Sequence, residues 1–120
     1  MLTAEEALDR LKKGNQRFVN GETTHLKLLT HQQRAEMAES QDPFAIVLGC
    51  SDSRVPAEMV FDQGLGDLFV IRVAGNIVAP SQVGSVEFAA ESFGCPVVIV
   101  LGHTHCGAIH STIEALTNPA

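Results

Sequence analysis

Two short runs of apolar residues, each followed at once by residues that can bind a metal or act in catalysis, constrain the fold more than any other feature of the sequence. The first run covers residues 44–48 and leads into Gly49-Cys50-Ser51-Asp52-Ser53-Arg54. The second covers residues 97–101 and leads into Gly102-His103-Thr104-His105-Cys106-Gly107. Such runs are typical of buried parallel strands, and ligands gather at the carboxyl ends of those strands. The sequence therefore predicts a sheet edge where the two polar segments meet.

Cap and turn signals divide the rest of the chain into alternating helices and strands. Thr3-Ala4-Glu5-Glu6 is a capping box that begins a helix. Residues 22–29 show no clear hydrophobic periodicity and are expected to be a connector. The last helix is expected to bury Ile109 and Ile113 and to end at Asn118-Pro119. Strands that alternate with helices indicate an α/β fold, with a parallel β-sheet core flanked by helices. The expected strands are 44–49, 68–73 and 96–101, and the expected helices are 4–19, 31–40, 56–61, 81–92 and 107–116.

Length and charge narrow the class of protein. The 120 residues predict one domain, with an N-terminal helical arm over about 3–40 and a sheet that carries the site over about 41–120. The formal net charge of −6 argues against nucleic-acid binding, which needs a basic patch. The apolar runs are too short to span a bilayer, and the N-terminus lacks the features of a secretory signal. Three cysteines favour a reducing compartment over a disulfide framework, so we expect a cytoplasmic protein.

Cys50, His103 and Cys106 are the strongest candidates for metal ligands. Thiolates and imidazole are the ligands that zinc prefers, and three protein ligands leave a fourth position open, as in catalytic rather than structural zinc sites. The alternative interpretation is that both cysteines are small buried apolar residues. Two cysteines and a histidine at neighbouring strand ends favour the metal.

Asp52 and Arg54 follow Cys50 at alternate positions, so in an extended segment all three side chains face the same side. A carboxylate beside zinc serves either as a fourth ligand or as a group that orients a metal-bound hydroxide. Arg54 would hold the carboxylate by a bidentate pair and keep it away from the metal. The alternative is a plain ion pair that caps the helix beginning at Pro56. The spacing Cys-x3-Arg is too short for the phosphate loop of tyrosine phosphatases.

These motifs together resemble the β-class carbonic anhydrases. The resemblance rests on Cys50-Ser51-Asp52-Ser53-Arg54 and His103-x-x-Cys106-Gly107, and it extends to residues 14–18, 61–67 and 72–76. It implies a β-carbonic-anhydrase-like fold and one Zn²⁺ per chain, held by the two cysteines and the histidine. A metal-bound hydroxide would then attack CO2 to give bicarbonate and a proton. Asp52 would orient that hydroxide and Arg54 would hold Asp52, although in some members Asp52 becomes a fourth ligand in a closed state.

The resemblance also implies a subgroup and an assembly. Gln41 matches the substrate-binding glutamine of the plant-like, open-site subgroup, and Val47 stands where the allosteric subgroup usually has tryptophan. Substrate contacts are expected from Gln41, Phe69, Phe88 and Gly107, with an aromatic residue supplied by a partner subunit. Phe88 replaces a common tyrosine, and the chain has no tyrosine. A homodimer or a dimer of dimers is expected, and family members usually continue past position 120.

Two other functions fit the same residues. One is hydrolysis of CS2 or COS on the same fold, which uses similar site residues. The other is a non-catalytic, zinc-stabilised module or fragment, in which Asp52 would be a permanent fourth ligand.

Overall fold

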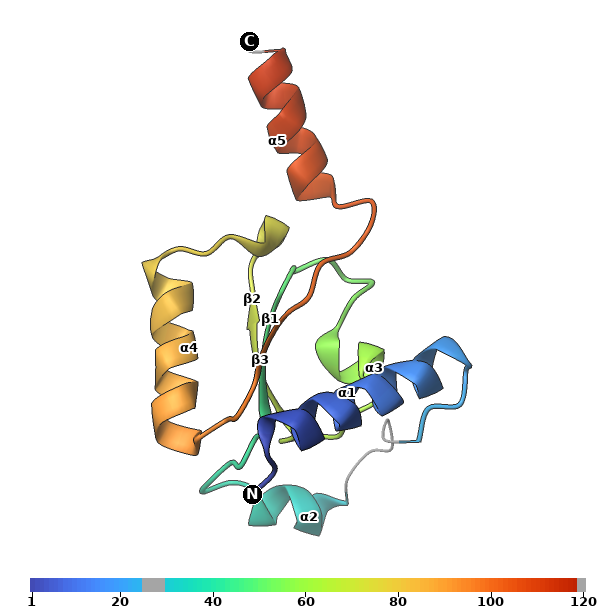
Figure 1. Ribbon diagram of the computed structural model, residues 1–120, viewed down its shortest axis with the longest axis vertical. Coiled ribbons are helices and arrows are strands. Elements are labelled where there is room, and N and C mark those ends of the chain that lie inside the picture. Colours follow the sequence, from blue (N-terminus) through green and yellow to red (C-terminus); the bar gives the residue numbers. More distant parts are fainter. Residues whose placement is uncertain (25–29, 119–120) are drawn as a thin grey trace.

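The structure is a computed structural model that describes residues 1–24 and 30–118. Three parallel strands form one sheet in the order β2-β1-β3, with helices on both faces (Figure 1). The strands are β1 (Ala45–Gly49), β2 (Leu68–Arg72) and β3 (Val98–Val100). The helices are α1 (Ala4–Val19), α2 (His31–Glu36), α3 (Ala57–Val60), α4 (Pro80–Phe93) and α5 (Gly107–Thr117), with a 3-10 turn, η1 (Ala74–Asn76), after β2.

The predicted parallel α/β fold is confirmed, and the differences lie at element ends. The second helix ends at Glu36 instead of continuing to about residue 40, because it has no buried residue to extend its packing. The third strand is limited to three residues. Most of the predicted connector, residues 25–29, lies outside the described residues, as does Pro119 of the predicted helix stop.

The central strand β1 aligns the two polar segments. All five of its residues are buried, as its purely apolar run predicts for a strand with neighbours on both sides. Leu48 lies opposite Ile71 of β2 and Val100 of β3. Because all three strands are parallel, their carboxyl ends, and the segments that follow them, meet at one edge of the sheet.

Two layers of helices cover the sheet unequally. On one face, α1 and α3 bury an apolar cluster, and on the other face α4 packs over a smaller cluster (Figure 1). The first cluster consists of Leu11, Ala45, Val47, Ala57, Phe61 and Leu68. The second consists of Ile46, Ile71 and Ala89, with Phe69, Val86, Phe93 and Cys95 packed against it.

The last helix does not pack as predicted. α5 extends away from the sheet (Figure 1), and none of its residues is buried. Ile109 is 47% exposed and Ile113 is 55% exposed, so the expectation that they are buried is wrong. The periodic apolar positions do form a helix, but within the described chain only η1 contacts it, near Ala108 and Ile109.

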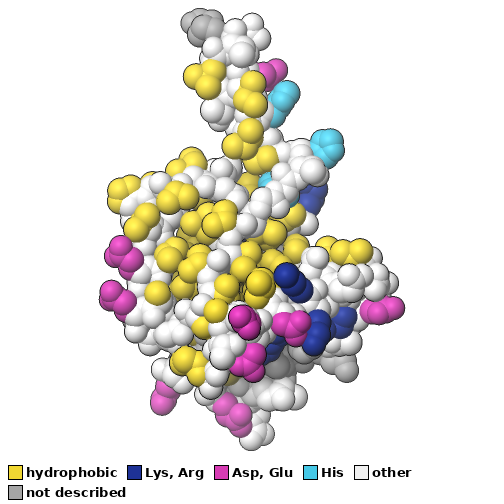
Figure 2. Space-filling view, viewed as in Figure 1, with side chains coloured by type: hydrophobic (Ala, Val, Ile, Leu, Met, Phe, Trp, Pro, Cys, Tyr) yellow, Lys and Arg dark blue, Asp and Glu magenta, His cyan; other side chains and the backbone are white. Residues whose placement is uncertain are grey.

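The β3 edge of the sheet also carries apolar surface. Val98 and Val100 are 44% and 67% exposed. Both lie on the same face of the sheet as Ile46, but on that face α4 packs over β1 and β2 rather than over β3. Figure 2 shows apolar side chains gathered over this edge and along α5. Among the described residues, no helix is both long and apolar enough to cross a membrane.

Candidate metal centre

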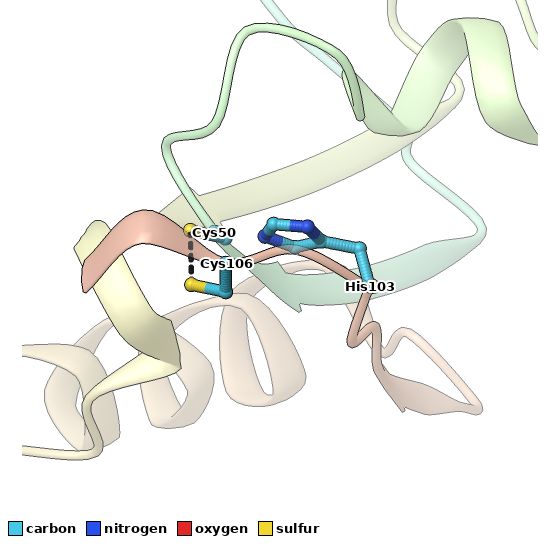
Figure 3. A group of neighbouring side chains, drawn as sticks. All are labelled: Cys50, His103 and Cys106. Carbon is cyan, nitrogen blue, oxygen red and sulfur yellow. Dashed lines mark hydrogen bonds between the residues drawn. The ribbon is translucent and has the colours of Figure 1, made fainter. Parts of the chain in front are cut away.

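Cys50, His103 and Cys106 come together at the carboxyl edge of the sheet. Cys50 follows β1 directly, His103 lies in the loop after β3, and Cys106 is the residue before α5 (Figure 3). Their potential ligand atoms all lie within 4.8 Å of one another. Segments that are distant in sequence therefore form the predicted three-residue group, because two neighbouring parallel strands end side by side.

The distances within this group suit a tetrahedral metal. The two sulfur atoms are 3.9 Å apart, as the dashed line in Figure 3 marks. Two sulfurs bound to one zinc at about 2.3 Å each, with a tetrahedral angle between them, are about 3.8 Å apart. All three cysteines of the chain are free thiols, so both sulfurs are available as ligands.

His103 presents one ring nitrogen to the two sulfurs. Its Nε2 is buried and, within the described part of the chain, has no hydrogen-bond partner, which is costly for a buried polar atom. Its Nδ1 lies 2.8 Å from the carbonyl oxygen of Thr104, a contact that places the proton on Nδ1 and leaves Nε2 free to bind. Ligating histidines usually donate their second ring N–H in this way, so the group fits zinc.

The electrostatics of the group also favour a cation. The backbone N–H of Gly75, followed by the imidazole of His103, lowers the pKa of the Cys50 thiol to about 6. The neighbouring Cys50 sulfur and the Thr104 carbonyl raise the pKa of His103 above its ordinary value. Both pKa shifts indicate that the surroundings of Cys50 and His103 stabilise a thiolate with a positive charge beside it. A bound zinc ion satisfies the same preference.

Asp52 and Arg54 form a bidentate pair next to the three candidate ligands. Arg54 donates from Nε to Oδ1 of Asp52 at 2.9 Å and from Nη2 to Oδ2 at 2.6 Å, and the Arg54 backbone N–H also donates to Oδ1. These contacts hold the pKa of the Asp52 carboxyl well below its usual range. Asp52 Oδ2 lies 4.0 Å from His103 Nε2, close enough to touch a molecule bound at the group.

Arg54 also connects the two polar segments. Its Nη2 donates to the carbonyl oxygen of His105 at 3.0 Å. His105 has a φ of 56°, a left-handed conformation that is uncommon for a side-chain-bearing residue. The alternative of a simple helix cap does not describe Arg54, because α3 has no side-chain cap bond.

A small cavity of about 200 Å³ adjoins the group. It is lined by His103 and Cys106 together with Gly75, Asn76, Gly102 and Ile109. Gly107, a predicted substrate contact, is the first residue of α5 and follows Cys106 directly. A space of this size beside the candidate ligands suits a small substrate.

The other predicted substrate contacts lie elsewhere in the chain. Gln41 lines a different cavity, of about 560 Å³, with Met37 and Leu65. Phe69 and Phe88 contact each other, with ring centroids 5.9 Å apart, on the sheet face that α4 covers. None of the three lines the cavity beside His103, so within one chain they are not brought to the metal group.

Sequence reasoning assigned no role to three residues that contact the ligand segments. Arg72 donates to the backbone of the Cys50 segment, Gly75 donates to the Cys50 sulfur, and Asn76 donates to Leu101. The available signal was their position: Arg72 ends β2 and the other two residues follow it, and β2 ends at the same sheet edge as β1 and β3. The end of β2 carries no side chain of the types that bind zinc, so ligand chemistry alone did not single it out.

Comparisons with known proteins agree on one family. A family described as carbonic anhydrase matches residues 45–120. Carbonic anhydrase 2 of Mycobacterium tuberculosis is 44% identical over 108 residues, which are 90% of this chain and 52% of that protein. The carbonic anhydrase of Mycolicibacterium smegmatis is 47% identical over 106 residues, or 88% of this chain and 51% of that protein. The chain thus spans about half the length of the curated relatives it matches.

Solved structures give the same fold. The β-carbonic anhydrase CcaA superposes with a TM-score of 0.66 and 32% identity, covering 92% of this chain and 54% of that one. An apo form of carbon disulfide hydrolase superposes with a TM-score of 0.52 and 27% identity, covering 86% of this chain and 43% of that one.

Proposed function

The chain belongs to the carbonic anhydrase family, and on that premise we propose that it catalyses the reversible hydration of CO2 to bicarbonate and a proton. One zinc ion per chain would be held by Cys50, His103 and Cys106. The observation that carries the proposal is the group of three converging ligand atoms with a carboxylate–guanidinium pair beside it. Zinc bound there would supply a Lewis acid that makes water nucleophilic near neutral pH.

Asp52 and Arg54 would orient the reacting water. Asp52 remains ionised because Arg54 binds both of its oxygens, so it can only accept a hydrogen bond. By accepting one from the reacting oxygen, it directs a lone pair of that oxygen toward the carbon of CO2. The oxygen–carbon bond forms, one carbon–oxygen double bond of CO2 opens to give bicarbonate, and the proton passes to solvent.

The same contacts support an open site. A closed site would need Asp52 as fourth ligand, and that carboxylate would first have to leave Arg54. Here both carboxylate oxygens accept hydrogen bonds from the guanidinium, and Arg54 is itself tied to His105. Val47 and Gln41 favour the same open-site subgroup.

We also propose that a second copy of the chain completes the substrate pocket, in a homodimer or a dimer of dimers. Gln41, Phe69 and Phe88 lie away from the metal group of their own chain, and Phe88 is 51% exposed. A partner could therefore present the aromatic residues to the cavity beside His103. Sedimentation of the zinc-loaded chain checks the assembly: a single monomeric species contradicts it.

A reducing compartment suits the candidate metal centre. All three cysteines are free, and the 3.9 Å between the sulfurs of Cys50 and Cys106 would allow them to oxidise, which would remove two zinc ligands. Glutathione and thioredoxin prevent this in the cytoplasm, which we propose as the location. Recovery of the native protein with oxidised Cys50 and Cys106 would contradict that assignment.

Stopped-flow measurement of CO2 hydration by the zinc-loaded chain tests the activity. Asp52→Ala and Arg54→Ala are expected to retain zinc and to lose about 10–100-fold in rate, as for other groups that orient a metal site. Asp9→Ala is the matched control, because Asp9 forms an exposed pair with Lys13 on α1. Full activity in the Asp52 or Arg54 variant would contradict their proposed roles.

The assay also separates the competing functions. Release of sulfide from CS2 without hydration of CO2 would identify a carbon disulfide hydrolase. An inactive chain with full zinc occupancy, and with Asp52 bound to the metal at every pH, would identify a structural zinc module.

A further inference from the structure

A short segment that contributes no metal ligand contacts both segments that do. Residues 72–76, here called the brace, begin at the last residue of β2 and include η1. From one side the brace contacts the Cys50–Asp52 segment, and from the other it contacts Leu101, two residues before His103. The brace therefore joins the two halves of the metal group through hydrogen bonds of its own.

Arg72 is the strongest part of the brace. Its Nε donates to the carbonyl oxygen of Cys50 at 2.9 Å, and its Nη2 donates to the carbonyl oxygen of Asp52 at 2.6 Å. The two acceptors flank Ser51, so one guanidinium fixes the backbone on both sides of that residue. A planar fork of donors can do this, whereas the ammonium of lysine is a point charge on a flexible stem.

Gly75 and Asn76 extend the contact in both directions. The Gly75 N–H donates to the Cys50 sulfur at 3.3 Å, and the Asn76 Nδ2 donates to the Leu101 carbonyl oxygen at 2.7 Å. Both residues have left-handed backbone conformations, with φ of 76° and 56°. Glycine and asparagine are the residues that adopt this conformation most readily. The turn that aims the N–H and the amide therefore depends on these two residue types.

In the part of the chain that the structure describes, few other hydrogen bonds join the two ligand segments. The backbone bond from Leu101 to Leu48 is the last rung between β1 and β3, and it lies before both ligand segments. Beyond it, the Arg54 side chain reaches His105, but that side chain is 63% exposed. Arg72 bonds to Cys50 itself, and Asn76 adds a second bond at Leu101, two residues before His103.

We propose that the brace is the positioning element of the metal centre: it sets how far the Cys50 thiolate lies from His103 and Cys106, and thereby sets metal affinity. Arg72 is its main positioning residue, and it acts through the backbone of Cys50 and Asp52 without touching metal or substrate. This inference rests on the proposed zinc site. Partners that orient ligands in this way typically change metal affinity by about 10–100-fold when they are removed.

Three variants test the brace. Arg72→Gln removes the charge and the fork, Arg72→Lys keeps the charge without the fork, and Asn76→Gly removes the amide while keeping a residue that accepts positive φ. Arg10→Gln and Arg10→Lys are the matched controls. Arg10 makes an equally specific set of contacts, to Gln63 and Asp67, at the opposite end of the sheet.

Two measurements distinguish an effect on the position of the metal ligands from a general loss of protein stability. The first is the zinc dissociation constant, measured by competition with a chelator. The second is the thiolate-to-cobalt absorption of the Co²⁺-loaded chain, which reports the geometry of the two sulfurs. Arg72→Gln is expected to weaken zinc binding about 10–100-fold and to shift the cobalt spectrum, with smaller losses for Arg72→Lys and Asn76→Gly. The Arg10 variants are expected to retain the parent affinity and spectrum.

Parent affinity and an unchanged cobalt spectrum in all three brace variants would overturn the proposal. So would equal losses in the Arg10 variants, because the effect would then be one of general stability. The outcome is independent of catalysis: a parent chain that binds zinc but does not hydrate CO2 contradicts the proposed activity, while the affinities of the variants still decide on the brace. A parent chain that binds no zinc contradicts the metal centre and the brace together.

Discussion

Gly14 is the residue whose lack of a side chain matters most to the packing of α1. It is buried in the middle of that helix, where glycine is intrinsically unfavourable by about 1 kcal/mol relative to alanine. A Cβ at this position would collide with the backbone carbonyl of Phe61 and would lie 2.9 Å from the side-chain nitrogen of Gln63. Glycine at this position therefore allows α1 and the segment after α3 to approach closely.

We expect Gly14→Ala to destabilise the fold by about 2 kcal/mol in urea unfolding, because overpacking against a backbone carbonyl outweighs the gain in helix propensity. Gly84→Ala is the matched control. Gly84 lies inside α4, and a Cβ there has nothing within 4 Å, so the same change is expected to stabilise by about 0.5–1 kcal/mol. Equal effects of the two substitutions would contradict the close-packing explanation.

Residue types and their spacing were sufficient to predict that the three candidate ligands come together. Cys50, His103 and Cys106 are chemically distinctive and follow apolar runs, so their convergence could be inferred without coordinates. The roles of Arg72 and Asn76 could not, because both act through backbone carbonyls, and a backbone acceptor has no signature in the sequence.

At the scale of elements, an ion pair whose carboxylate is buried joins α1 to the segment after α3. Asp62 is fully buried and pairs with Arg17, whose side chain is 29% exposed. Asp62 also accepts hydrogen bonds from Thr24. Removal of one partner of a buried pair leaves an uncompensated charge, which is the costly case.

Arg17→Met is therefore expected to lower the free energy of unfolding by about 3 kcal/mol, measured by urea denaturation. Lys13→Met provides the comparison on the same helix. Lys13 pairs with Asp9 at 2.8 Å, but both side chains are more than half exposed, so its loss should cost no more than about 0.5 kcal/mol. A comparable loss of unfolding free energy in the two variants would contradict a stabilising ion pair between Arg17 and buried Asp62.

The start of α1 gives a pH-dependent prediction. Thr3 and Glu6 form a reciprocal capping box, and the hydrogen bond from the Thr3 backbone lowers the pKa of Glu6 below its ordinary value of 4.5. The folded pKa is the lower one, so ionised Glu6 stabilises the fold above the unfolded pKa. That contribution is lost as the pH falls through the folded pKa.

Thr3→Ala is expected to raise the pKa of Glu6 toward 4.5, because the N-terminal turn loses its cap and frays. Titration of the Glu6 carboxyl by NMR measures the shift. Thr30→Ala removes a similar box at the start of α2 and should leave Glu6 unchanged. An unaltered Glu6 titration in the Thr3 variant would contradict the coupling.

Elements with strong local signals were predicted well, and those that depend on tertiary contacts were not. The capping boxes at Thr3 and Thr30 mark the true starts of α1 and α2. The burial of Ile109 and Ile113 was predicted wrongly, because periodicity shows that a helix has an apolar face but not what covers it. Exposed apolar faces of this kind commonly mark interaction surfaces.

At the scale of the whole molecule, the parallel sheet explains why the candidate ligands gather at one edge. Three strands with the same direction end together, and each end contributes something different to the centre. β1 leads to Cys50 and Asp52, β3 leads to His103 and Cys106, and β2 leads to the brace. The central claim is that these three strand ends form one zinc centre with two sulfur ligands and one nitrogen ligand.

X-ray absorption at the zinc edge of the zinc-loaded chain tests that claim most directly. The account predicts one zinc per chain, with two sulfur neighbours at about 2.3 Å and nitrogen or oxygen in the remaining positions. Cys50→Ser and Cys106→Ser should each remove one sulfur, whereas Cys95→Ser, at a thiol that donates to Pro43 instead, should remove none. A zinc shell without sulfur, or one that loses a sulfur in the Cys95 variant, would contradict it.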